Sequence, residues 1–115
     1  MRPATARELW TELTRLFPDF ARDHTAQDLE ASERAGGARL HSVMIPFSQY
    51  FGAVRDSFSE TQLKNLGQLL NEAVEVDDDL ENAVSTCFLE HLQQIDSYKL
   101  LAPFLGRRAK DKTHA

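Results

Sequence analysis

Hydrophobic residues recur every three to four positions along most of the chain, and no stretch alternates hydrophobic and polar residues over the length of a strand. A repeat near 3.6 residues is typical of helices that bury one face. The first such repeat predicts a helix over residues 5–17. Its apolar side consists of Leu9, Trp10, Leu13, Leu16 and Phe17. Thr5 and Glu8 have the spacing of a capping box at its start, and Pro18 favours an end just before it.

The strongest repeat predicts a central helix over residues 38–57. Its apolar residues, the last of which lies just beyond that range, are Leu40, Val43, Met44, Phe47, Tyr50, Phe51, Val54 and Phe58. Four of these residues are aromatic, so we expect this helix in the middle of the core. Pro46 either lies near the true start of the helix or kinks it, because proline removes one backbone hydrogen bond.

Two further helices are predicted over residues 60–75 and 78–95. Ser59 and Gln62 form a second capping-box pattern, and Gly67 marks either a weak point or a point of close packing. Asp78 is a good N-cap for the second of these helices. Its apolar side comprises Leu80, Ala83, Val84, Cys87, Phe88, Leu92 and Ile95. Residues 97–106 predict a short helical or turn-like element that Pro103 interrupts.

The segment from Pro18 to Gly37 has fewer apolar residues, chiefly Phe20 and Leu29 among charges. It predicts a short helix around residues 26–34 and too little apolar surface to belong wholly to the core. We therefore expect this segment to be mobile or to contact a partner.

Together these patterns predict an all-α fold, a compact bundle of four to five helices in a single domain of residues 1–105. Short connections make the helices over 38–57, 60–75 and 78–95 antiparallel neighbours. The predicted core contains Leu13, Leu16, Val43, Phe47, Phe51, Val54, Leu66, Leu70, Val84, Cys87, Phe88 and Ile95. Residues 106–115 have no apolar side chain larger than alanine and predict a basic, disordered tail.

Charge is distributed unevenly along the chain. The formal net charge is −5, and residues 106–115 carry four basic and one acidic side chain, or +3, which leaves −8 on residues 1–105. An acidic body repels phosphate, so we predict no nucleic-acid binding by the folded part. Such a body suits a basic protein partner. The tail could contact nucleic acid or acidic lipid, or serve only solubility.

The candidate chemistry lies in residues 76–92, which contain three adjacent acids, the only cysteine and a histidine. The acids suit the start of a helix and lack the spacing of a calcium-binding loop. Cys87 and His91, four residues apart, could share a zinc ion or form a reactive thiolate. Zinc needs about three protein ligands, and the remaining histidines, His24 and His41, fall in or beside the weakest part of the pattern. We predict a packing role for Cys87 and no catalytic, cofactor-binding or metal-ligating residues.

Length and cysteine content restrict the cellular setting. A chain of 115 residues can form one domain without disulfides or structural metal. The single cysteine has no internal partner, no apolar run reaches the roughly 18 residues of a membrane span, and the start lacks the apolar core of a signal peptide. We therefore expect a cytoplasmic protein with no membrane contact.

Three stretches carry a family resemblance: YFGAVRDSF at 50–58, LNEAVEVDDDLENAVSTCFLEHL at 70–92 and LAPFLG at 101–106. In them the chain resembles a family of short helical bacterial proteins without an assigned activity, over about residues 40–105. The resemblance implies an all-helical fold and a bacterial source, and it carries over no functional residue. In size and charge the chain is also similar to the immunity proteins that neutralise bacterial toxins.

Catalytic motifs are missing from the sequence, which has no GxSxG, no glycine-rich phosphate loop and no CxxC. We therefore predict a protein that is not an enzyme, a non-catalytic binding module similar to an immunity protein or antitoxin that neutralises a basic toxin. The alternatives are a structural or adaptor module of a larger assembly, and a Cys87-dependent enzyme or metal protein.

Overall fold

All the secondary structure in the described part of the chain is helical, which confirms the predicted all-α class. The computed structural model describes residues 2–35, 40–92 and 97–113. The five helices of nine or more residues are α1 Ala6–Leu16, α3 Ala26–Arg34, α4 Leu40–Ala53, α5 Glu60–Ala73 and α6 Asp79–Cys87. Shorter elements are α2 Phe20–Asp23, α7 Tyr98–Leu101, α8 Arg107–Asp111 and the 3₁₀ turns η1 Arg55–Ser57, η2 Leu89–His91 and η3 Ala102–Phe104.

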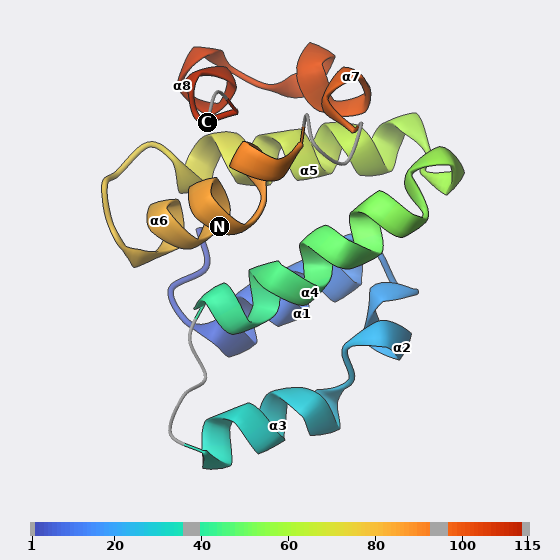
Figure 1. Ribbon diagram of the computed structural model, residues 1–115, viewed down its shortest axis with the longest axis vertical. Helices are drawn as coiled ribbons and strands as arrows, with labels where there is room; N and C mark the ends of the chain where they lie inside the picture. Colours follow the sequence, from blue (N-terminus) through green and yellow to red (C-terminus); the bar gives the residue numbers. More distant parts are fainter. Residues whose placement is uncertain (1, 36–39, 93–96, 114–115) are drawn as a thin grey trace.

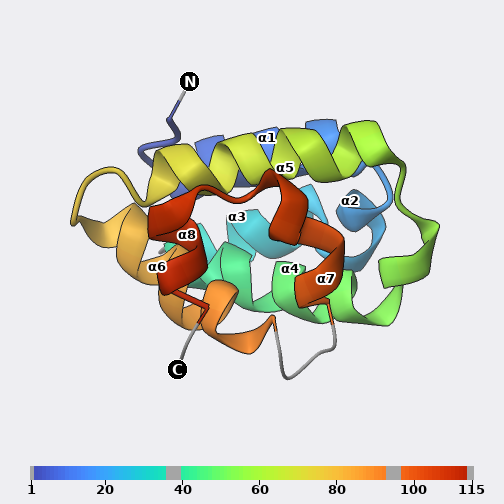
Figure 2. The same ribbon diagram turned by 90° about the horizontal axis from the view of Figure 1, so that it is seen from above.

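The long helices pack in two layers. Figure 2 shows α1 and α5 along one side of the molecule, with α4 on the other, and α1 contacts both α4 and α5. α6 packs against α4 and α5. In Figure 1, α4 and α5 run in opposite directions, as predicted, α7 and α8 lie over α5, and α3 lies at the opposite end. No described helix combines the length and apolar character that crossing a membrane requires.

Local capping explains where the helices begin. The Ser59 hydroxyl accepts the Gln62 N–H and the Gln62 side chain accepts the Ser59 N–H, which completes the predicted capping box of α5. At α1, Thr5 accepts the Glu8 N–H, but the Glu8 carboxylate accepts the N–H of Ala4 rather than that of Thr5. The prediction of a capping box at α1 is therefore right for Thr5 and shifted by one residue for Glu8.

The core is built around aromatic rings from four parts of the chain. Phe17 and Phe47 are fully buried with ring centroids 5.5 Å apart, and Phe47 lies equally close to Phe88. Phe20, from the segment predicted not to belong wholly to the core, packs edge-on against Phe47 at 5.1 Å. α2 and α3 therefore contribute to the core through Phe20 and Leu29, both fully buried, and α3 covers the range predicted for it.

Most of the predicted core is confirmed. The buried members are Leu13, Leu16, Val43, Phe47, Phe51, Leu66, Leu70, Val84 and Phe88. The prediction that Val54 is buried is wrong, because α4 ends at Ala53 and leaves this side chain 37% exposed. Cys87 is only partly buried, so it does not belong to the buried core, but it packs against that core from its edge. Ile95 lies outside the described residues.

Two predicted helices end early. The helix predicted over 38–57 is described from Leu40 to Ala53, contains Pro46 in its interior and is followed by η1. The helix predicted over 78–95 ends at Cys87, where Phe88 leaves the helical region with φ −132° and ψ −63°. This break turns the chain so that Phe88, Leu89 and Leu92 are all fully buried, and burial outweighs the continuing 3.6-residue pattern.

Candidate functional site

The connection between α5 and α6 presents the most concentrated run of acidic residues in the sequence. Four of the five residues at 75–79 are acidic and exposed, and the fifth, Val76, is an exposed hydrophobic residue at 54%. Glu81 follows in the first turn of α6. We call residues 75–81 the acidic junction. It combines negative charge with an apolar side chain that a partner could cover.

Asp78 occupies the predicted N-cap position of α6, where its carboxylate accepts the Glu81 N–H at 3.1 Å. The same carboxylate accepts two hydrogen bonds from the Arg2 guanidinium, both at 2.6 Å. The Arg2 bonds, the Glu81 N–H and the positive charge of Arg2 lower the pKa of Asp78 from its usual 3.8 to about 2. Asp78 is therefore ionised at neutral pH and fixed in place.

Arg2 also closes the end of α5. Its Nε donates to the Glu72 carbonyl at 3.1 Å and its Nη2 to the Ala73 carbonyl at 2.9 Å. Both carbonyls belong to the last turn of α5, where partners within the helix run out; the Glu72 carbonyl also accepts the Glu75 N–H at 3.3 Å. One guanidinium thus holds the end of α5 and the start of α6 together on either side of the acidic junction.

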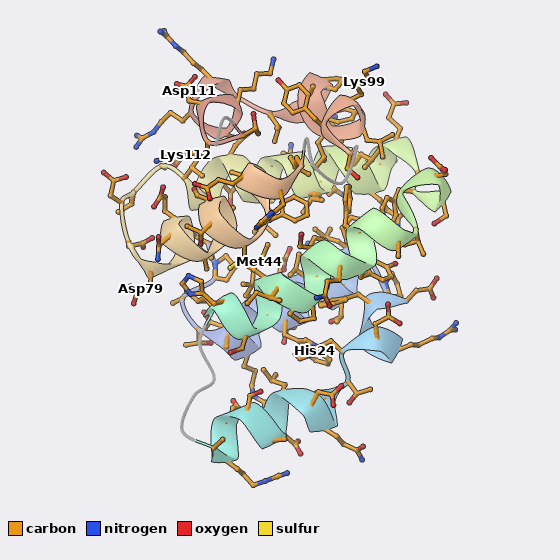
Figure 3. The ribbon with its side chains drawn as sticks, in the orientation of Figure 1. His24, Met44, Asp79, Lys99, Asp111 and Lys112 are labelled. Atoms are coloured by element: carbon orange, nitrogen blue, oxygen red, sulfur yellow. The ribbon has the colours of Figure 1, made fainter. Side chains whose placement is uncertain are left out.

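α8 holds the acidic junction from the C-terminal side of the chain. Arg108 donates to the Glu75 carbonyl at 3.1 Å and lies 3.9 Å from the Asp77 carboxylate. Lys112 pairs with the Glu81 carboxylate at 2.8 Å, and this hydrogen bond raises the pKa of Lys112. Figure 3 shows Lys112 and Asp79 on the same, left-hand side of the molecule. The prediction of a disordered tail is wrong for residues 106–113.

The start of α8 is anchored on α5. The Asn71 side chain accepts the Gly106 N–H at 2.7 Å and donates to the Phe104 carbonyl at 3.1 Å. Phe104 lies directly on Gly67, where an added Cβ would come within 2.6 Å of the Phe104 Cβ. Gly67 is therefore a point of close packing, one of the two predicted alternatives. Within α8 itself, Ala109 is fully buried.

Cys87 lies in a separate cleft between α4 and the end of α6. The cleft has a volume of about 390 Å³ and is lined by Ile45, Ser48, Gln49, Thr86, Cys87 and His91. Cys87 and His91 thus line one cleft although the helix ends between them. His24 stacks on Phe20 and His41 lies 3.4 Å from Asn82, so neither joins this cleft. The described residues hold no group of three acidic, cysteine or histidine side chains placed to bind a metal.

The sequence pattern pointed to Asp78 but not to its partners. Arg2 precedes Asp78 by 76 positions, and nothing in either local sequence indicates the pair. The basic run at the C-terminus is visible in the sequence, but it contains no apolar side chain larger than alanine that would predict packing against the core. No family model matches the chain, and searches of curated proteins and of solved structures also gave no match.

Proposed function

We propose that the protein is a non-catalytic module that binds a basic protein partner through the acidic junction. The observation that carries this proposal is a loop, held at both ends by hydrogen bonds of Arg2, that exposes Val76 and the three aspartates after it. Asp77, with 82% of its side chain exposed, and Asp79 are directed to solvent. A loop with this composition offers both charge and an apolar contact.

Both features suit protein recognition. Exposed carboxylates accelerate the approach of a basic partner and favour it over an acidic one. The exposed Val76 side chain supplies apolar surface at the centre of the charged loop. Because Arg2 already holds the end of α5 and the Asp78 side chain at the start of α6, we expect little loss of conformational entropy on binding.

A basic bacterial toxin is the partner class that we favour, with the protein acting as an immunity protein or antitoxin. The support is the charge of −8 on residues 1–105 and the exposed acidic loop. We place the protein in the cytoplasm, where its single cysteine would stay reduced.

The test is affinity purification from the native host at low and at high salt, followed by mass spectrometry. We expect wild type to enrich a basic protein at low salt, where screening is weakest. The double variant Asp77→Asn, Asp79→Asn should lose it, and Asp78 is left intact because it caps α6. The matched control is Asp23→Asn, Glu30→Gln, which removes two exposed acidic charges from α2 and α3.

The possible outcomes distinguish between binding surfaces and between functions. If only the control variant loses the partner, the interface lies on α2 and α3 and not at the acidic junction. If wild type enriches no basic protein at low salt, the proposal fails. A structural or adaptor module would instead self-associate, which sedimentation of the purified protein would show.

A further inference from the structure

The contacts of α8 repeat with the period of a helix. Arg108 and Lys112, four residues apart, direct their cations to the two ends of the acidic junction. The residue after each cation, Ala109 and Thr113, is buried with an exposed fraction of 0% and 2%. α8 and the two residues after it, Lys112 and Thr113, therefore contact the rest of the protein through one face composed of two cations and two small side chains.

Glu81 makes the surface that α8 and Lys112 contact selective for a cation. The residue is 9% exposed, and its carboxylate contacts Lys112 and the Ser85 hydroxyl. Burying a charged group is unfavourable unless an opposite charge pairs with it. Whatever replaces α8 on this surface must place a cation beside Glu81.

α8 also has little stability of its own. It has five residues, far fewer than a helix needs to be stable alone in water. Arg108 and Asp77 are 58% and 82% exposed, and ion pairs with that exposure contribute little in salt. The ion pairs of α8 with the acidic junction are therefore weak, while the hydrogen bond between Gly106 and Asn71 attaches its start to α5 and Ala109 is buried in the core cluster.

We propose that α8 is an autoinhibitory stand-in for a basic helix of the partner, which displaces α8 to reach Glu81, the covered end of the otherwise exposed acidic junction. This inference rests on the proposed function and adds the chemistry of the partner. The partner helix carries two Arg or Lys residues four positions apart, each followed by Ala, Ser, Thr or Gly. Larger residues at the inward positions would not fit where Ala109 and Thr113 are now buried.

Displacement has a measurable consequence. If α8 covers Glu81 most of the time, only the molecules with α8 open can bind a competing helix. The apparent affinity for that helix is then the intrinsic affinity multiplied by the open fraction. Weakening α8 should restore that affinity. The substitution Arg108→Ala, Lys112→Ala removes both cations of the contact face. Lys110→Ala removes a cation from the exposed face of the same helix and serves as the matched control.

The probe is a synthetic peptide of residues 104–113, acetylated and amidated, titrated into the ¹⁵N-labelled full chain with detection at the α6 amides. We expect wild type and Lys110→Ala to bind it equally weakly, and the double variant to bind it about tenfold more tightly. Equal affinity for all three proteins would overturn the inference, as would equal strengthening by Lys110→Ala.

Hydrogen exchange of the wild-type chain provides a second measurement that does not depend on the folding of a variant. The amides of residues 108–113 should exchange through local opening that accelerates in salt, while those of α5 remain protected. Exchange of α8 only by global unfolding would overturn the inference. If the same partner is captured with equal affinity by wild type and double variant, only autoinhibition fails. If neither captures any basic protein, the proposed function fails.

Discussion

Arg2 and Asp78 lie 76 positions apart in the sequence and meet in an ion pair with two hydrogen bonds, each 2.6 Å long. The same guanidinium donates to the carbonyls of Glu72 and Ala73. A planar group with several donors in a fixed geometry can bind a carboxylate and a helix end together, which a lysine ammonium cannot do with the same geometry. The first residues of the chain therefore control the shape of the acidic junction.

We expect Arg2→Ala to destabilise the fold by about 1–2 kcal/mol, because it removes the hydrogen bonds to the Ala73 carbonyl and to the Asp78 carboxylate. Arg2→Lys should recover only part of that loss. The matched control is Arg22→Ala, since Arg22 is 84% exposed in a 3.6 Å ion pair with Asp19, and its loss should cost no more than about 0.5 kcal/mol. Urea unfolding measures the stability of all three variants. Equal effects of Arg2→Ala and Arg22→Ala would contradict the role of Arg2 in joining α5 to α6.

Acid should weaken the junction in a defined pH range. The pKa of Asp78 is lowered from 3.8 to about 2 by Arg2 and by the Glu81 N–H, so the folded state favours the ionised carboxylate. The resulting stability is complete above pH 3.8 and is lost as pH falls towards 2. The pH dependence of the urea midpoint should therefore be shallower in Asp78→Asn than in wild type. Asp23→Asn, which alters an exposed acid elsewhere, should leave the slope unchanged.

The helix starts could be predicted from the sequence because capping is a local interaction. The side chains of Thr5, Ser59 and Asp78 each accept an N–H three residues further along the chain. The pattern could not predict the end of α6, where the helical repeat continues past Cys87 in the sequence. What ends that helix is the burial of Leu89 and Leu92 against the rest of the core, which is a tertiary effect.

The folded C-terminus could not be predicted for a related reason. α8 contains no apolar side chain larger than alanine, so its own sequence is typical of a tail. Its partners lie 31 to 35 residues earlier: Glu81 for Lys112, the Glu75 carbonyl for Arg108, and Asn71 for Gly106. Contacts over such separations leave no periodic signal, although complementary charge was visible in both segments.

Gly67→Ala should destabilise the protein by about 1–3 kcal/mol, although alanine is the better helix former by about 1 kcal/mol. The added methyl group would lie 2.6 Å from the Cβ and 2.8 Å from the carbonyl oxygen of Phe104. That separation forces the C-terminal segment away from α5. Gln68→Ala, at the next and exposed position of the same helix, should change stability by less than about 0.5 kcal/mol. A stabilised Gly67→Ala variant would show that Phe104 is not packed on α5.

Cys87 should react with a thiol reagent while the protein is folded. Its side chain is partly buried in an open cleft rather than enclosed in the core, so the reagent can reach the sulfur without unfolding. The labelling rate should therefore stay constant at low urea concentrations. The matched control is the variant Ser85→Cys, Cys87→Ala, which moves the thiol to a position 6% exposed on the same helix. Labelling there should be much slower and should accelerate with urea, because it requires opening of the fold. If Cys87 itself shows the urea-dependent behaviour, the thiol is a core residue as the sequence pattern predicted, and the cleft is closed in solution.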